Sequence, residues 1–267
     1  MKHKLQFSFA AAAAIAAATL FGISDSALGQ EGKAKAKAPA APSKPTPKLA
    51  DGKVDLGGNG MWAPIWVQDW ADTRWVEKKI DVPFTEKAAA LFKERKDTIS
   101  AHDPEGFCLP PGVPRYTGTP YPFQIIQLKD RVLFIHESMH GYRIIFLKDD
   151  LKHPPIEELN PNWLGHSVGR YEDNGMTFVV DTVGFNGRTW LDYVGHPTSE
   201  DLHVVERITR PDYDTLHYVA TIEDKQMYKQ PWTTSFNIRW REGQELIEYI
   251  CNENNRDILH MDTKGPK

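Results

Sequence analysis

Nine short runs of β-type residues, separated by turns, occupy the sequence from Phe123 to Cys251. Short runs rich in Val, Ile, Phe, Tyr and Thr between turn residues are typical of strands. The run from Trp232 to Trp240 alternates apolar and polar residues, which indicates one buried and one wet face. The expected strands are Phe123–Leu128, Arg131–Glu137, Tyr142–Leu147, Val168–Tyr171, Met176–Thr182, His203–Thr209, Leu216–Ile222, Trp232–Trp240 and Glu245–Cys251.

The short connections between these runs predict strands that pair with their sequence neighbours. A meander of this length usually closes on itself, because closure removes the unpaired edges. We therefore predict a mainly β fold, an antiparallel up-and-down barrel or strongly curled sheet, lipocalin-like in outline, with one external helix. A barrel of about eight to ten strands leaves room for a small ligand. A β-sandwich is the alternative.

One helix is expected, from Pro83 to Asp97. Thr85 can cap its start, and Glu86 suits the positive end of a helix dipole. The alanine-rich segment that follows has high helix propensity. We assign this helix a packing role.

The N-terminal residues have the composition of an export signal. Lys2 and Lys4 precede an apolar run, and small residues stand at the cleavage-critical positions 27 and 29. A membrane anchor is the alternative, but the apolar run is short for a span. We expect a signal peptide over 1–29, a flexible Lys/Ala/Pro linker over 30–53, and a single β domain over 54–267. The mature chain would then be periplasmic or secreted, with no transmembrane segment.

The charge balance excludes one class of partner. The formal net charge is −4, and the Lys-containing stretch near the N-terminus has no aromatic residues for base stacking. A nucleic-acid-binding protein would carry a basic surface, so we expect no nucleic-acid partner.

The chain has two cysteines, Cys108 and Cys251. In an oxidising compartment an isolated pair most simply forms a disulfide. Two free thiols, or one metal ligand each, are the alternatives.

Four tryptophans, at 62, 66, 70 and 75, follow a glycine-rich segment. They are consistent with a plate that closes one end of the core. The alternative is an aromatic platform for a sugar or another planar ligand.

The segment from Trp163 to Arg210 has many ionisable residues within β-type sequence. A dry core would not require them, so we predict a polar pocket in the β domain. His136 and Glu137 point to opposite faces of a strand, and we place Glu137 inward. The expected catalytic residues are Glu137, His140, His166, Asp181 and His203; the expected substrate-binding residues are Arg170, Trp190, His196 and Glu206.

Three interpretations of the histidines remain open. Two or three of them with a carboxylate suit a divalent transition metal such as zinc, iron or copper, and the candidates are His140, His166, His196 and His203. Alternatively, one histidine works with Glu137 or Asp181 in acid–base chemistry. In the third interpretation, each histidine only satisfies backbone groups at strand ends and turns.

Several phrases of the sequence resemble a family of secreted bacterial proteins of unknown function. They are Cys108-Leu-Pro-Pro-Gly-Val-Pro-Arg115, Gly165-His-Ser-Val-Gly-Arg170, Val180-Asp-Thr-Val-Gly-Phe-Asn186 and Tyr249-Ile-Cys-Asn-Glu-Asn254. The resemblance covers about Asp51 to Asp257 and implies export, but it carries no catalytic residues. The family tends to have Tyr where this chain has His136, which makes His136 a weaker candidate than His140.

These observations predict an exported protein with a pocket for a small molecule. The first hypothesis is an enzyme that acts on a small polar or carbohydrate-like molecule by acid–base or metal-assisted chemistry. The second is a lipocalin-like binder of a small apolar or aromatic ligand. The third is a structural component of the cell envelope that uses the Lys/Ala/Pro arm to reach a partner.

Overall fold

The structure is a computed structural model that describes residues 44–253, 255–256 and 259–261. The expected signal peptide and the expected linker up to residue 43 lie outside these residues. Within the described part of the chain, no helix combines the length and apolar character that a membrane crossing requires.

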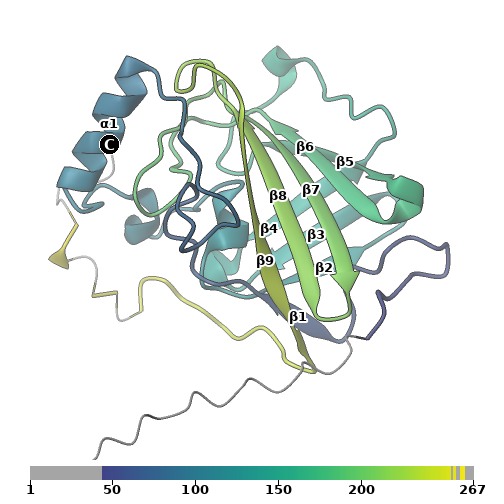
Figure 1. The fold of residues 1–267 in the computed structure, drawn as a ribbon. Helices are drawn as coiled ribbons and strands as arrows, with labels where there is room; N and C mark the ends of the chain where they lie inside the picture. The colour runs from purple at the N-terminus through teal and green to yellow at the C-terminus, as the bar shows by residue number, and fades with distance from the viewer. Residues whose placement is uncertain (1–43, 254, 257–258, 262–267) are drawn as a thin grey trace, which may run out of the picture. The chain divides into compact units, whose positions relative to one another are not determined.

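Nine strands form a closed barrel in which each strand pairs with its sequence neighbours and β1 pairs with β9 (Figure 1). The predicted mainly β barrel is therefore confirmed. The strands are β1 (Gly60–Ala63), β2 (Phe123–Gln127), β3 (Arg131–His136), β4 (Tyr142–Leu147), β5 (His166–Glu172), β6 (Thr177–Val183), β7 (His203–Asp212), β8 (Thr215–Glu223) and β9 (Trp232–Glu242).

One pair departs from the expected antiparallel order. β4 and β5 are parallel, with Ile145 opposite Ser167, whereas the other pairs are antiparallel. A parallel pair requires a long crossover connection, which here is residues 148–165. The sequence did not reveal this, because a long connection can lead to either strand direction.

The barrel closes through a different strand from the one expected. Residues 245–250 form no ladder, although we predicted a strand from Glu245 to Cys251. The four-residue β1, Gly60–Ala63, takes that place and pairs with β9 over Gly60–Ala63 and Arg239–Glu242. The last segment instead leads to Cys251, which forms the predicted disulfide with Cys108.

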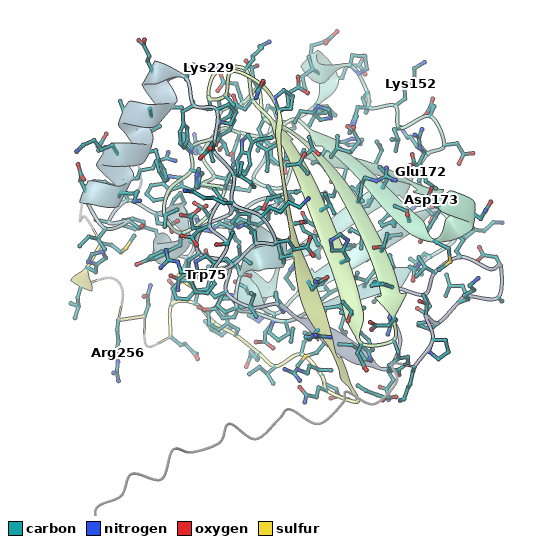
Figure 2. The ribbon with its side chains drawn as sticks, viewed as in Figure 1. Trp75, Lys152, Glu172, Asp173, Lys229 and Arg256 are labelled. Atoms are coloured by element: carbon teal, nitrogen blue, oxygen red, sulfur yellow. A yellow bond between two sulfur atoms is a disulfide. The ribbon has the colours of Figure 1, made fainter. Side chains whose placement is uncertain are left out.

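The β5–β6 turn shows how local sequence sets the register. Asp173, Asn174 and Gly175 all have positive φ, a conformation that Asn, Asp and Gly tolerate best. The turn places Glu172 opposite Thr177 and continues the ladder to His166 and Val183. Figure 2 shows Glu172 and Asp173 at this turn, on the side of the barrel remote from α1.

Large side chains occupy the barrel interior. The fully buried aromatic residues include Trp62, Phe123, Phe134, Phe178, Tyr218 and Phe236. Among them lies one ion pair, between Arg143 on β4 and Glu206 on β7. The interior that we expected to receive a ligand is therefore built as a core.

The predicted helix is α1 (Glu86–Asp97), which lies outside the barrel (Figure 1). Thr85 caps it, since its side chain accepts the N–H of Ala88. Short 3-10 helices lie in the loops: η1 (Pro104–Phe107), η2 (Arg115–Gly118), η3 (Ser138–His140), η4 (Ile156–Glu158) and η5 (Asp173–Gly175).

The end of the expected linker contacts the barrel. Thr46 donates its hydroxyl to the carbonyl of Arg210 at 2.8 Å, and the N–H of Tyr213 donates to Lys44 at 3.0 Å. The N–H of Val54 donates to the carbonyl of Gly175 at 2.9 Å.

Candidate functional site

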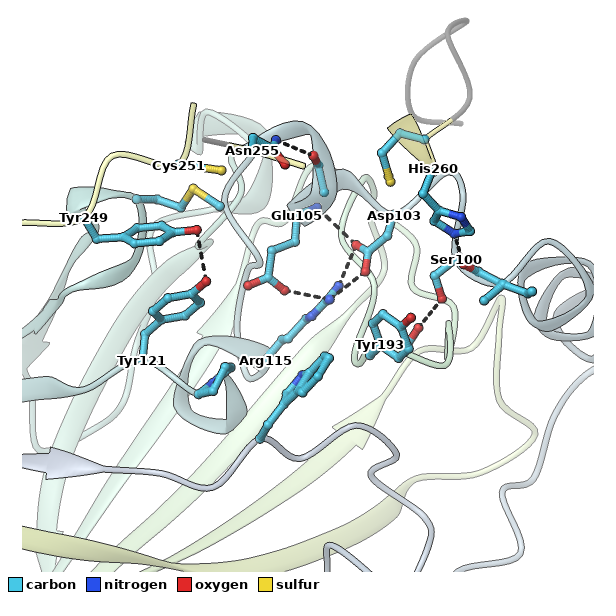
Figure 3. Close-up of a pocket in the computed structure, with 16 residues that line it drawn as sticks. Ser100, Asp103, Glu105, Arg115, Tyr121, Tyr193, Tyr249, Cys251, Asn255 and His260 are labelled. Atoms are coloured by element: carbon cyan, nitrogen blue, oxygen red, sulfur yellow. Dashed lines mark hydrogen bonds and ion pairs between the residues drawn. The ribbon is translucent and has the colours of Figure 1, made fainter. Parts of the chain in front are cut away.

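A pocket of about 320 Å³ lies among the loops outside the barrel (Figure 3). Its wall comes from Trp66, from residues 99–121, from Met139, from the loop around Tyr193 and from the segment that begins at Tyr249. The Cys108–Cys251 disulfide joins two of these segments, so it fixes the pocket wall although the residues are far apart in sequence. This volume lies within the usual range of small-molecule sites, about 300–1,000 Å³.

A buried cluster of charges forms one side of the pocket. Arg115 binds Asp103 through two parallel hydrogen bonds, Nη1–Oδ1 at 2.8 Å and Nη2–Oδ2 at 2.7 Å. Its Nη2 also lies 2.6 Å from Oε2 of Glu105. The side chains of Arg115 and Asp103 are each 6% exposed and that of Glu105 is 16% exposed, so one guanidinium serves two desolvated carboxyls.

The local backbone explains why these groups meet. Asp103 caps η1 by accepting the N–H of Glu105 at 3.1 Å, and Pro104 occupies the first turn. Cys108 ends η1 in the left-handed conformation, with φ of 62°. The proline-rich chain then returns, and η2 begins at Arg115.

The two carboxyls do not have equal environments. Burial raises the pKa of Glu105, the neighbouring Asp103 raises it further, and Arg115 only partly offsets both effects. Burial opposes the charge of Arg115, but Asp103 and Glu105 raise its pKa overall. The raised pKa favours the protonated form of Glu105 relative to that of an exposed glutamate.

Aromatic rings flank this charge cluster. Trp66 is 40% exposed and meets Tyr193 edge-on, with ring centroids 5.1 Å apart. On the other side, Tyr121 and Tyr249 have centroids 4.6 Å apart and hydroxyl oxygens 3.0 Å apart. Figure 3 shows Glu105, Asp103 and Arg115 between the Tyr121–Tyr249 pair and Tyr193. The pocket can therefore pack a ring against aromatic faces and offer a proton donor to its polar groups.

Three predicted catalytic residues meet elsewhere, on the outer face of the sheet. Asp181 on β6 accepts from His203 Nε2 at 3.0 Å and contacts His153 Nε2 at 2.9 Å. Nδ1 of His153 lies 2.7 Å from Nδ1 of His166. His166, Asp181 and His203 lie close together, but outside the barrel rather than in an interior pocket, because they occupy outward positions of β5, β6 and β7.

The pKa values of this outer histidine chain diverge. Burial lowers the pKa of His166, and nearby His153 lowers it further. The hydrogen bond to Asp181 raises the pKa of His203. Burial opposes the charge of Asp181, yet its two histidine partners lower its pKa overall.

The other two predicted catalytic residues lie at the end of β3 and in η3. Glu137 accepts the backbone N–H of Ile247 at 3.0 Å and therefore holds the C-terminal segment. His140 is exposed and ends η3 with φ of 48°. The five residues do not line one pocket: His140 and His166 line a cavity of about 410 Å³, whereas Glu137 and His140 line another that lacks Asp181 and His203.

The predicted substrate-binding residues are also dispersed. Arg170 binds Glu172 on the outer face at 2.6 Å and 2.9 Å. Trp190 is buried, with the guanidinium of Arg95 4.2 Å from its ring centroid. Glu206 is fully buried and pairs with Arg143.

His196, the fourth predicted substrate-binding residue, lines a second cavity and belongs to a cluster of possible metal ligands. One oxygen each from Asp69 and Asp192 and one ring nitrogen of His196 lie within 4.8 Å of one another. His196 was predicted as a binding residue, whereas its two carboxylate neighbours were not.

The sequence reasoning also missed Asp103, Glu105, Arg115 and His153. The proline-rich loop had one usable signal, because a segment that cannot form a strand and carries a disulfide must be ordered by other contacts. An Asp and a Glu two positions apart, followed by a single Arg, were candidates for those contacts.

Comparisons with protein-family models, curated proteins and solved structures found no match. The function must therefore be argued from the geometry of this chain.

Proposed function

We propose that this protein is exported and binds a small carbohydrate-like molecule in the loop pocket, where Glu105 acts as a proton donor. A sugar ring presents apolar C–H faces that pack on aromatic rings and hydroxyls that need polar partners. The pocket offers both, through Trp66, Tyr121 and Tyr193 on its walls and the Arg115 cluster on its side.

The observation that carries the proposal is the unequal pair of carboxyls at one guanidinium. Asp103 receives a two-point hydrogen bond from Arg115, whereas Glu105 has a single 2.6 Å contact and a raised pKa. Two carboxyls in different environments are the usual arrangement when one must remain protonated to act as a general acid. A protonated Glu105 can donate to an ether or hydroxyl oxygen of the bound molecule.

Export rests on the sequence and on one structural finding. The Cys108–Cys251 disulfide is typical of an oxidising compartment such as the periplasm or the exterior. The signal peptide and the family resemblance remain predictions that agree with it.

The filled barrel weighs against a lipocalin-like binder of apolar ligands. In lipocalins the ligand enters the barrel, but here Tyr218, Phe134 and the Arg143–Glu206 pair occupy that region. The loop pocket is instead lined by both charged and aromatic residues.

The test is a binding and turnover screen with three variants. The probes are 4-nitrophenyl glycosides and the corresponding free disaccharides. Turnover of the glycosides is measured by release of nitrophenol, and binding of both kinds of probe is measured by thermal shift. Glu105→Gln removes the proton donor, Trp66→Ala removes an exposed aromatic wall, and Glu157→Gln is a control at an exposed glutamate in η4.

We expect Glu105→Gln to retain binding but lose at least about 100-fold in turnover, as for a missing general acid. Trp66→Ala should weaken binding, and Glu157→Gln should match the wild type. The proposal fails if no probe binds, or if a probe binds and turns over equally well in the wild type and in both pocket variants.

A further inference from the structure

A second cavity lies beside α1, and it shares no lining residue with the loop pocket. Its volume is about 570 Å³, and its lining includes Asp69, Lys79, Phe84, Lys96 and His196. The segment around residues 191–197 separates the two sites, since Tyr193 lines the loop pocket and His196 lines this cavity.

His196 is held rigidly at this cavity. It is only 2% exposed, and its ring stacks on Phe92 at 4.4 Å and on Phe84 at 5.6 Å between centroids. Its Nδ1 lies 2.5 Å from Oδ2 of Asp192. This packing leaves the imidazole little freedom to rotate, which is the condition for a preorganised ligand.

Asp192 is fixed by the backbone. Its Oδ1 accepts the N–H groups of Gly195 and His196, each at 3.0 Å, and its Oδ2 accepts the N–H of Trp70 at 2.9 Å. The residue is fully buried. These three backbone donors fix the orientation of the carboxylate, and His196 Nδ1 contacts its Oδ2.

A buried arginine lies near the cluster: Arg95 donates to the carbonyl of Gly195 at 3.2 Å, and Asp192 is one of the groups that offset the lowering of its pKa by burial. Among the described residues, neither Asp69 nor Asp192 forms a salt bridge with Lys or Arg, and Asp192 pairs with His196. Asp69 receives the N–H of Ala71 at 2.9 Å on Oδ1. Two carboxylates near one imidazole in a largely desolvated place favour a cation between them.

We propose that Asp69, Asp192 and His196 bind a divalent transition-metal ion, with Zn²⁺ as the best match. Ligand atoms within 4.8 Å of one another need to approach by only about 1 Å to surround an ion with bonds of about 2.0–2.2 Å. Three nitrogen and oxygen ligands leave a fourth position for water, as in catalytic zinc sites. This position opens on a cavity whose lining carries both charges, from Lys79 and Lys96 and from Asp72 and Asp81.

The experiment is a Zn²⁺ titration of tag-free, chelator-stripped protein by calorimetry, with bound metal counted after dialysis. We compare the wild type with Asp69→Asn and His196→Gln. The matched control is Asp81→Asn, because Asp81 is an exposed acidic residue that lines the same cavity but lies outside the cluster. A second control, His203→Gln, tests the outer histidine chain as an alternative zinc site.

We expect one Zn²⁺ per wild-type chain. Loss of a ligand should weaken its affinity by at least about 10-fold in Asp69→Asn and His196→Gln, and the two control variants should match the wild type. Co²⁺ in place of Zn²⁺ should broaden the NMR signals of His196 and of the Ala71 amide first.

Absence of stoichiometric zinc in the wild type would overturn the proposal, as would undiminished binding in Asp69→Asn. Loss of binding in His203→Gln alone would assign the metal to the outer chain and would also overturn it. If His196→Gln fails to fold, Asp69→Asn and the Co²⁺ experiment still decide. Neither result depends on sugar binding, so this proposal and the proposed function fail separately.

Discussion

The ion pair inside the barrel gives the largest predicted effect of a single substitution. Arg143 donates to Glu206, to Ser167 Oγ at 3.0 Å and to Thr182 Oγ1 at 2.7 Å, and Tyr218 donates its hydroxyl to Glu206 at 2.7 Å. The side chains of Arg143 and Glu206 are 4% and 0% exposed. Glu206→Gln therefore preserves size and leaves a buried guanidinium without its counter-charge.

The expected cost follows from this burial. Removal of one partner of a buried pair typically destabilises by about 3–5 kcal/mol, because the remaining charge stays desolvated. Domains are usually stable by only about 5–15 kcal/mol, so the variant would be close to unfolding. At about 2–4 °C per kcal/mol, the loss in Tm is about 6–20 °C.

Urea denaturation followed by tryptophan fluorescence measures the effect, with calorimetry for Tm. The double variant Arg143→Met, Glu206→Gln removes both charges and should recover part of the loss, which completes a double-mutant cycle. Glu245→Gln is the control, because residue 245 is exposed. A free energy of unfolding within about 0.5 kcal/mol of the wild type for Glu206→Gln would refute the reasoning.

Three further predictions concern pH and the disulfide. Burial, with a contribution from Arg143, lowers the pKa of His136 from 6.5 to about 3, so the folded state keeps this side chain neutral. The stability that this neutral side chain contributes is complete above pH 6.5 and is lost as the pH falls toward 3. In urea titrations at pH 7 and pH 4, His136→Phe should reduce the loss in the free energy of unfolding between the two pH values by up to about 3 kcal/mol. An equal loss in the wild type and the variant would contradict this. His203 has a raised pKa, so its pairing with Asp181 stabilises the fold fully below the unfolded pKa and progressively less as the pH rises through the folded pKa. His203→Gln should lower the free energy of unfolding by under about 1 kcal/mol at pH 5.5 and by less at pH 8. A larger loss at pH 8 than at pH 5.5 would exclude this pairing. Reduction of Cys108–Cys251 should lower the free energy of unfolding by up to about 5 kcal/mol, because the bridge closes a loop of 143 residues, and it should also weaken any probe bound in the loop pocket; an unchanged urea midpoint would contradict this account.

The barrel was predictable because its strands show the two-residue alternation that the buried face demands. The turn at Asp173–Gly175, the helix capped by Thr85 and the pairing of Cys108 with Cys251 were predictable for local or counting reasons. The parallel β4–β5 pair was not, because it depends on the path of residues 148–165 rather than on either strand.

The sites were harder to predict, because they form between segments that no local pattern connects. Asp181 and His203 lie on paired strands and meet on their outward face, although the sequence suggested an arginine as the partner of Asp181. Arg115 and Glu105 come from an irregular loop, where no periodicity says which way a side chain points. Their meeting depends on the cap at Asp103 and on a disulfide to the far end of the chain.

The central claim is that Glu105 has a raised pKa in an aromatic pocket and can act there as a proton donor. Site-resolved ¹³C NMR of the glutamate side-chain carboxyls, titrated from pH 3 to pH 8, measures this directly. The account predicts a midpoint for Glu105 clearly above that of exposed Glu157 in the same spectra, with a further change when a disaccharide probe is added. A Glu105 midpoint equal to or below that of Glu157 would contradict it.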